Sequence, residues 1–141
     1  KIRQQRYSRM IEKGIIDEKT APLSPQQISS WDSLSASERK LESQRMEIHA
    51  AMVDCMDQNI GRLIAKLKEQ GEFNNTLFLF FSDNGASHEG ANSGKRTYKF
   101  TGEEKMGSVM SYEGIGRNWA KVLNTPLAQT KIHSHEGGNA A

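Results

Sequence analysis

Ser82, Asp83, Asn84 and Gly85 form a polar group at the end of an apolar run, TLFLFFS, which covers residues 76–82. A carboxylate and an amide oxygen are donors that hard cations such as calcium and magnesium prefer. Two neighbouring ligands are too few for such an ion, so other segments would have to supply the rest. The alternative is a simple chain reversal, because Asn-Gly is a common turn dipeptide. By spacing alone, the turn is the favoured interpretation.

A second group of side chains with possible chemistry lies near the end of the sequence, at Lys131, His133, His135 and Glu136. A lysine held near a cation site could neutralise an anionic substrate. The His-x-His-Glu pattern could bind zinc, but it is a weak signal and a solvated loop is the simpler interpretation. The two glycines that follow would let the backbone come close to a ligand.

Other candidates lie within one apolar-periodic segment and favour structural interpretations. Cys55 has no adjacent base, so a structural cysteine is favoured over a nucleophile. His49 borders the apolar stripe and is interpreted as a packing or surface residue. Asp54 and Asp57 are three residues apart, which is typical of a helix surface.

A long helix is expected before the apolar run that leads to the polar group. Apolar residues recur every three or four positions from Met46 to Leu67, which predicts a helix over residues 38–70. Ser35 and Glu38 have the spacing of a capping box at its start. Gly71 is placed to end it.

The segment FNNTLFLFFS, residues 73–82, predicts a strand. Its apolar run is continuous rather than alternating, which is typical of a central strand that is covered on both faces. A helix, a short loop and a buried strand form the repeating unit of an α/β sheet. One strand and one long helix cannot make a two-layer domain, so we expect the chain to be part of a larger α/β protein.

The remaining segments are shorter or irregular. Residues 1–13 predict a surface helix that Gly14 ends. An irregular connector follows, with Trp31 as its anchor to a core. Residues 86–118 show no periodicity and predict a long loop, which in a folded protein is usually functional or disordered.

The last segment, RNWAKVLNTPLAQTKIHSHEGG, provides an aromatic anchor at Trp119 and a turn at residues 124–126. Its end is polar and carries the lysine and histidines described above.

Composition limits the possible partners. The 141 residues carry 19 basic and 17 acidic side chains, mixed along the chain, for a net charge of +2. Without a basic block, a nucleic acid is not an expected partner. No apolar run is long enough to span a membrane. Cys55 is the single cysteine, so no internal disulfide can form.

Taken together, these motifs resemble the type I sulfatase, or arylsulfatase, family. The segment MEIHAAMVDCMDQNIGRLIAKLKEQGEFNNTLFLFFSDNGA, residues 46–86, resembles the helix and strand that end in Ser-Asp-Asn-Gly in that family. The segment SYEGIGRNWAKVLNTPLAQTKIHSHEGG, residues 111–138, is similar to its Asn-Thr-Pro, Lys and His-Glu-Gly-Gly elements. KIRQQRYSRMIEKGIID, at the start, looks like a charged helix of bacterial arylsulfatases.

The resemblance implies a fold and a mechanism. The fold is an alkaline-phosphatase-like α/β sandwich, of which residues 1–141 would form part of the catalytic domain: a long helix, a central strand and a long irregular loop. Asp83 and Asn84 would be calcium ligands, and Lys131 would contact the sulfate group of a sulfate ester substrate. The calcium and the lysine would draw off negative charge that develops on the sulfuryl oxygens.

Departures from the family pattern imply that this sequence is an interior piece. The family nucleophile is a formylglycine made in a Cys/Ser-x-Pro-x-Arg motif, and that motif is absent from residues 1–141. We therefore expect the nucleophile outside this segment, the rest of the catalytic domain as its partner, and no activity from the segment alone. A periplasmic or secreted location is expected from the resemblance only.

Two alternative functions stay open at this point. A phosphodiesterase or phosphonate hydrolase of the same superfamily would use a similar site with a different nucleophile. A non-catalytic helical interaction module would use the apolar stripe over residues 46–67 as a partner surface, and it would need neither calcium nor further chain.

Overall fold

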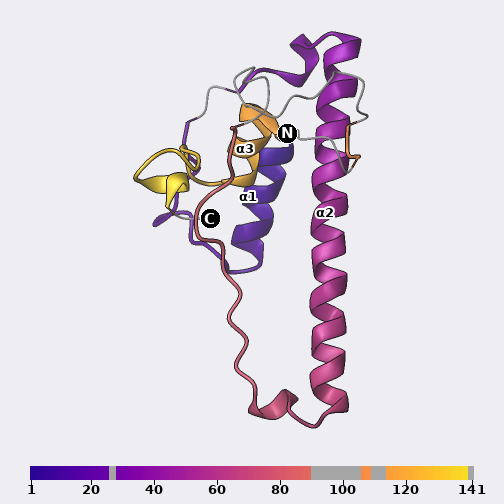
Figure 1. Cartoon of the computed structure of the whole chain (residues 1–141). Helices are drawn as coiled ribbons and strands as arrows, with labels where there is room; N and C mark the ends of the chain where they lie inside the picture. The colour runs from indigo at the N-terminus through magenta and orange to yellow at the C-terminus, as the bar shows by residue number, and fades with distance from the viewer. Residues whose placement is uncertain (26–27, 90–105, 109–113, 140–141) are drawn as a thin grey trace.

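The computed structural model describes residues 1–25, 28–89, 106–108 and 114–139. The helices in these residues are α1 (Ile2–Glu12), α2 (Ala36–Glu69) and α3 (Gly116–Leu123), with single 3-10 turns η1 (Trp31–Ser33), η2 (Phe73–Asn75) and η3 (Glu136–Gly138). Helices α1 and α3 lie side by side, whereas the C-terminal half of α2 projects away from them (Figure 1). An extended segment leads from η2 back toward α1 and α3.

The contact between α1 and α3 is the small core of the described part of the chain. Among the described residues, Tyr7 and Ala120 are the buried hydrophobic residues. The Tyr7 hydroxyl donates to the carbonyl of Ala21 over 3.0 Å, so its polar end is satisfied. Such a small buried area cannot by itself offset the conformational entropy that folding costs.

Arg3 fastens α1 to the turn after α3. Its guanidinium donates to the Ser24 carbonyl at 2.9 Å, to the Ser24 hydroxyl at 2.8 Å and to the Pro126 carbonyl at 3.0 Å. Partial burial lowers the pKa of Arg3 from its ordinary value. These charge-assisted bonds fix the predicted turn at residues 124–126, which the structure confirms, against the first helix.

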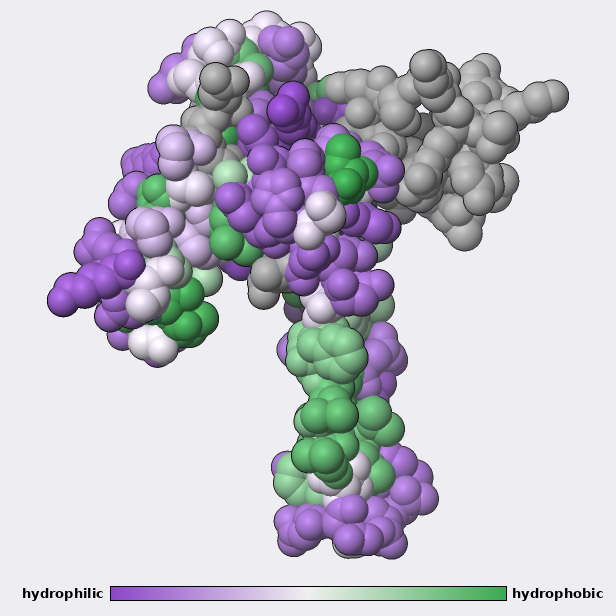
Figure 2. Space-filling view, turned by 90° about the vertical axis from the view of Figure 1, so that its left-hand side faces the viewer, coloured by the Kyte–Doolittle hydropathy of each residue, from purple (hydrophilic) through white to green (hydrophobic). Residues whose placement is uncertain are grey.

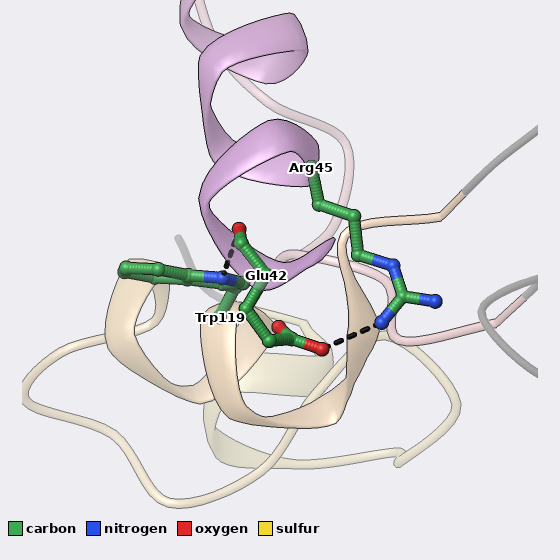
Figure 3. A network of polar contacts seen from close by, with 3 residues as sticks. All are labelled: Glu42, Arg45 and Trp119. Atoms are coloured by element: carbon green, nitrogen blue, oxygen red, sulfur yellow. Dashed lines mark hydrogen bonds and ion pairs between the residues drawn. The ribbon is translucent and has the colours of Figure 1, made fainter. Parts of the chain in front are cut away.

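A second polar contact joins α3 to α2. The indole Nε1 of Trp119 donates to the carbonyl of Glu42 over 3.0 Å, and the Glu42 carboxylate pairs with Arg45 one turn further along α2 (Figure 3). Arg45 is buried, with 5% of its surface exposed. Trp31 packs edge-on against Trp119 at 6.2 Å between ring centroids, so it joins the connector to α3, but it is 42% exposed and the predicted anchoring to a core is not found among the described residues.

Helix α2 confirms the long helix predicted from apolar periodicity, with slightly shifted bounds. Ser35 and Glu38 form the predicted capping box: the Ser35 hydroxyl accepts from the Glu38 N–H, and the Glu38 carboxylate accepts from the Ser35 N–H over 2.8 Å. Gly71 follows the helix with a φ of 79°, a conformation that glycine adopts without strain. Helix α1 likewise ends as predicted, before Gly14.

The capping box predicts a pH-dependent helix start. Hydrogen bonds from Ser35 lower the pKa of the Glu38 carboxyl. Because the folded-state pKa lies below the unfolded one, this stabilisation is complete above the ordinary glutamate pKa and is lost as pH falls through the folded pKa. We expect Glu38→Gln to remove this acid-dependent component from thermal unfolding curves recorded across that range. Glu47→Gln, an exposed change in the same helix, should leave it in place.

The predicted strand over residues 73–82 is not formed among the described residues. Residues 73–75 form η2 instead, and residues 76–82 are without helical structure and pair with no other strand among the described residues. The physical reason is that a strand needs neighbouring backbone to satisfy its N–H and C=O groups, and none of the described residues supplies it. The sheet of the expected α/β sandwich is therefore not formed within the described residues.

Exposed apolar side chains gather on the C-terminal half of α2 and on residues 77–81, which together are called the apolar column. Leu77, Leu79, Phe80 and Phe81 are each at least 75% exposed, and Met52, Val53, Met56 and Leu63 of α2 are also exposed. Figure 2 shows this hydrophobic surface on the lower part of the molecule. A contiguous apolar surface of this kind marks an interaction site rather than a solvated face.

Two further predictions are corrected by the structure. Cys55, interpreted as a structural cysteine beside the apolar stripe, is exposed, because this part of α2 has no covering element among the described residues. The irregular segment predicted over residues 86–118 ends earlier, since α3 begins at Gly116. Most of that predicted loop, at 90–105 and 109–113, lies outside the described residues.

None of the helices in the described part of the chain combines the length and the apolar character that crossing a membrane requires.

Candidate functional site

Residues 82–86 form a compact turn at the end of the extended segment. The Ser82 hydroxyl donates to the carbonyl of Asn84 over 2.6 Å, and the Asn84 amide donates to the carbonyl of Gly85 over 2.9 Å. The turn favoured by the Asn-Gly dipeptide is thus confirmed. A turn and a ligand site are compatible, however, because the Asp83 carboxylate has no hydrogen bond or ion pair with any described residue and is exposed.

This turn lies against the C-terminal loop that carries Lys131. The Lys131 N–H donates to the carbonyl of Ala86 over 3.2 Å, and the Gly85 N–H lies 3.5 Å from the carbonyl of Gly138. Two segments that are more than 40 residues apart in sequence therefore share backbone hydrogen bonds. The predicted metal ligands and the predicted catalytic lysine come from adjacent loops.

A hydrogen bond between side chains also joins the two loops. Nδ1 of His88 and the hydroxyl of the buried Thr130 lie 2.7 Å apart, so the residue next to Lys131 is also held to the first loop. His133 Nδ1 lies 3.0 Å from the Thr130 carbonyl. His88 was not among the residues singled out from the sequence, since nothing in its spacing connects it to a residue 42 positions away.

Glycine is required where the two loops touch. A Cβ atom on Gly85 would overlap the carbonyl oxygen of Gly137, and a Cβ atom on Gly137 would overlap the carbonyl oxygen of Gln129. Both obstacles are backbone atoms, which cannot rotate away as a flexible side chain can. The glycines of the Ser-Asp-Asn-Gly and Glu-Gly-Gly motifs therefore allow close approach of the two loops to each other.

Gly85→Ala should consequently separate the loops. We expect it to destabilise the full-length protein by about 1–3 kcal/mol, the usual cost of overpacking. Gly61→Ala is the matched control, because a Cβ there meets nothing within 4 Å among the described residues. In a helix interior this second change should be neutral or stabilise by about 0.5–1 kcal/mol. Equilibrium unfolding in urea measures both, and equal effects would contradict the close approach of the loops.

The charged side chains of the two loops are exposed. Lys131 and Asp83 are both exposed and form no ion pair with each other, while Asn84 is partly buried. An oxygen-only pair of donors on one turn fits a hard cation such as calcium, and the lysine on the adjacent loop fits an anion beside it. The fit is partial, because no group of three or more His, Cys, Asp or Glu residues in the described ranges could enclose a metal ion.

The same finding gives no support to a zinc site at His133, His135 and Glu136. The two histidine rings lie edge to face at 6.3 Å between centroids. The Glu136 carboxylate instead accepts a hydrogen bond from the Ala128 N–H over 2.9 Å. Glu136 also has a positive φ of 51°, which is unusual for a residue with a side chain and is consistent with a loop held in one shape by its contacts.

Asn124 is, with His88, a residue of this site that the sequence did not indicate. It was predicted only as part of a turn, yet its buried side chain contacts both loops. An asparagine before Thr-Pro is read as a turn residue by default, so the local sequence offers no signal for contacts made at a distance.

Comparison with known proteins identifies the family of the chain. The sulfatase family model matches residues 4–123. Over 97% of its length, the chain is 34% identical to an uncharacterised sulfatase of Schizosaccharomyces pombe, of which it covers 26%. It is 33% identical to an arylsulfatase of Klebsiella aerogenes, again over 97% of its length and covering 31% of that protein.

A shorter match, 38% identical over 60 residues, is to the uncharacterised sulfatase YdeN of Escherichia coli and covers 40% of the chain and 11% of that protein. The chain thus spans between about a quarter and a third of the two relatives that it matches along nearly its whole length. The family model covers most of the chain, from α1 to the end of α3. The chain therefore belongs to the sulfatase family.

Proposed function

We propose that the protein that contains this chain hydrolyses sulfate esters, and that residues 83–84 and Lys131 contribute to its active site. The observation that carries the proposal is the backbone junction between the turn of Asp83 and Asn84 and the loop of Lys131. Membership of the sulfatase family and similarity to an arylsulfatase support the reaction class.

The proposed roles follow from the chemistry of the side chains. Asp83 and Asn84 would supply two oxygen ligands to a calcium ion, which when bound would offset negative charge on a sulfate group. Lys131 would place its ammonium group on the same sulfate and stabilise the charge that develops as the ester bond breaks. The nucleophile, proposed to be a formylglycine, would come from outside residues 1–141.

We further propose that the rest of the catalytic domain covers the exposed apolar column. Residues 77–81 present consecutive apolar side chains with both strand edges unpaired among the described residues, as expected for a strand that joins a larger sheet. The exposed face of α2 would be buried in the same way. On this account, residues 1–141 alone do not turn over sulfate esters.

The proposal is tested by assaying the full-length protein with 4-nitrophenyl sulfate and with bis(4-nitrophenyl) phosphate, in calcium and after chelation. We expect calcium-dependent hydrolysis of the sulfate ester to dominate. Preference for the phosphate diester would favour the phosphodiesterase alternative. No turnover of either ester by the folded, calcium-loaded protein would overturn the proposed function.

A further inference from the structure

Asn124 connects the two loops of the candidate site through one buried side chain. It follows α3 directly, and only 3% of its surface is exposed. Its Oδ1 accepts from the Ala86 N–H over 2.7 Å. Its Nδ2 donates to the Gln129 carbonyl over 2.8 Å and to the Gly137 carbonyl over 3.1 Å.

In these three bonds the side-chain amide of Asn124 acts both as a hydrogen-bond acceptor and as a donor. One acceptor faces the loop of Asp83, and the amino group faces two carbonyls of the loop of Lys131. An aspartate of the same shape would keep the acceptor but would present oxygen to two carbonyl oxygens. An alanine would remove all three bonds and leave buried backbone groups without partners, which is costly.

The bonded positions are close in sequence to the proposed functional residues. Ala86 is three residues after Asp83, and Gln129 is two residues before Lys131. The loops also touch directly: the Lys131 N–H donates to the Ala86 carbonyl over 3.2 Å, the Gly85 N–H lies 3.5 Å from the Gly138 carbonyl, and His88 Nδ1 lies 2.7 Å from the Thr130 hydroxyl. Each of these contacts lies between a single pair of atoms. Asn124 adds one bond to the loop of Asp83 and two to the loop of Lys131 from a single buried side chain, so it fixes both loops to the same point after α3.

We propose that Asn124 is a positioning residue that sets the separation between the turn of Asp83 and Asn84 and the loop of Lys131. It does not touch the substrate; it acts through the backbone of both loops. The inference rests on the proposed function for its catalytic consequences, but the mechanical role of Asn124 can be measured without any activity.

Thr125 provides a matched control at the next position. It is similarly buried, with 4% of its surface exposed, and its hydroxyl donates to the Val122 carbonyl over 2.7 Å. That bond closes the end of α3 and reaches neither loop. Thr125→Val, which keeps the shape of the side chain and removes the hydrogen bond, therefore disturbs the same turn without releasing the site.

The first experiment measures hydrogen exchange in the full-length protein and in Asn124→Ala and Thr125→Val. Asn124→Ala should speed exchange at least about tenfold at the Ala86 and Lys131 amides, since a loosened junction opens more often. Thr125→Val should leave both amides close to their wild-type rates. If Asn124→Ala folds and both amides keep wild-type protection, the positioning role is wrong, whatever the activity.

The second experiment uses Asn124→Asp to remove the bonds to one loop and keep the bond to the other. The same variant also serves if Asn124→Ala does not fold. The aspartate keeps an acceptor for the Ala86 N–H and loses the donors to Gln129 and Gly137. We expect calcium affinity, measured by titration calorimetry, to stay within about threefold of wild type. The kcat for aryl sulfate hydrolysis should fall about 10- to 100-fold, the range seen when a residue that orients catalytic groups is changed.

The outcomes distinguish this inference from the proposed function. If Asn124→Ala exchanges faster at the Ala86 and Lys131 amides while the wild-type protein hydrolyses no sulfate ester, the positioning role is supported and the proposed function is rejected. Wild-type kcat in folded Asn124→Asp, with the sulfatase activity itself confirmed, would overturn the positioning role and leave the function intact.

Discussion

Replacing Asp83 by asparagine is expected to weaken calcium binding by the full-length protein at least about 10- to 100-fold and to lower kcat/KM for aryl sulfates by about 100-fold or more. The change keeps the size of the side chain but removes its negative charge, and hard cations are bound chiefly by charged oxygen. Because Asp83 is exposed and bonds no other described residue, the fold should be unaffected. Titration calorimetry and steady-state kinetics measure the two effects.

Asp54→Asn is the matched control for this experiment. Asp54 undergoes the same chemical change on the surface of α2, where its carboxylate accepts from the Gln58 side-chain amide over 2.7 Å. It should bind calcium and turn over substrate like the wild type. Unchanged calcium affinity in Asp83→Asn would show that the turn is not part of a metal site, and the Asn-Gly dipeptide would then serve only to reverse the chain.

Replacing Lys131 by alanine should lower kcat/KM by about 100- to 1000-fold, the usual effect of removing one group that stabilises transition-state charge. Calcium affinity should stay near the wild-type value, because an ammonium group is no ligand for a cation. Lys131 is exposed and its side chain pairs with no described residue, so stability should change little. Kinetics and calorimetry on the same preparation distinguish this result, a lower kcat/KM with unchanged calcium affinity, from that of Asp83→Asn, in which both fall.

Two further variants define the role of the lysine. Lys131→Arg keeps the charge but changes its shape and reach, so partial activity is expected. Lys66→Ala, on the far part of α2 where the lysine pairs with Glu69 over 3.0 Å, should retain full activity. Full activity of Lys131→Ala would place the sulfate-binding cation elsewhere in the protein.

Local signals in the sequence predicted the elements well. The period of apolar residues predicted α2, and the capping box at Ser35 and the glycine at 71 predicted its two ends, because these signals act within one or two helical turns. The short helix α1 followed from the same reasoning. Helix α3 was missed, since eight residues opened by a glycine carry too little periodicity to stand out from a loop.

Contacts between distant segments could not be predicted from these local signals. Asp83, Asn84 and Lys131 were predicted as site residues by resemblance to a family, and their mutual placement depends on bonds such as the one between Lys131 and Ala86. Asn124 shows the limit clearly, because its side chain bonds Ala86, Gln129 and Gly137, at three separate places in the chain. The predicted strand depends on neighbours too, and within the described residues it has none.

The most direct test of the account is a crystal structure of the full-length protein grown with calcium and inorganic sulfate, with the metal identified by anomalous diffraction. We expect a calcium ion about 2.3–2.6 Å from oxygens of Asp83 and Asn84. Nζ of Lys131 should lie about 2.7–3.2 Å from an oxygen of a sulfate ion beside the metal. A calcium ion bound elsewhere, or a bound sulfate out of reach of Lys131, would contradict the account.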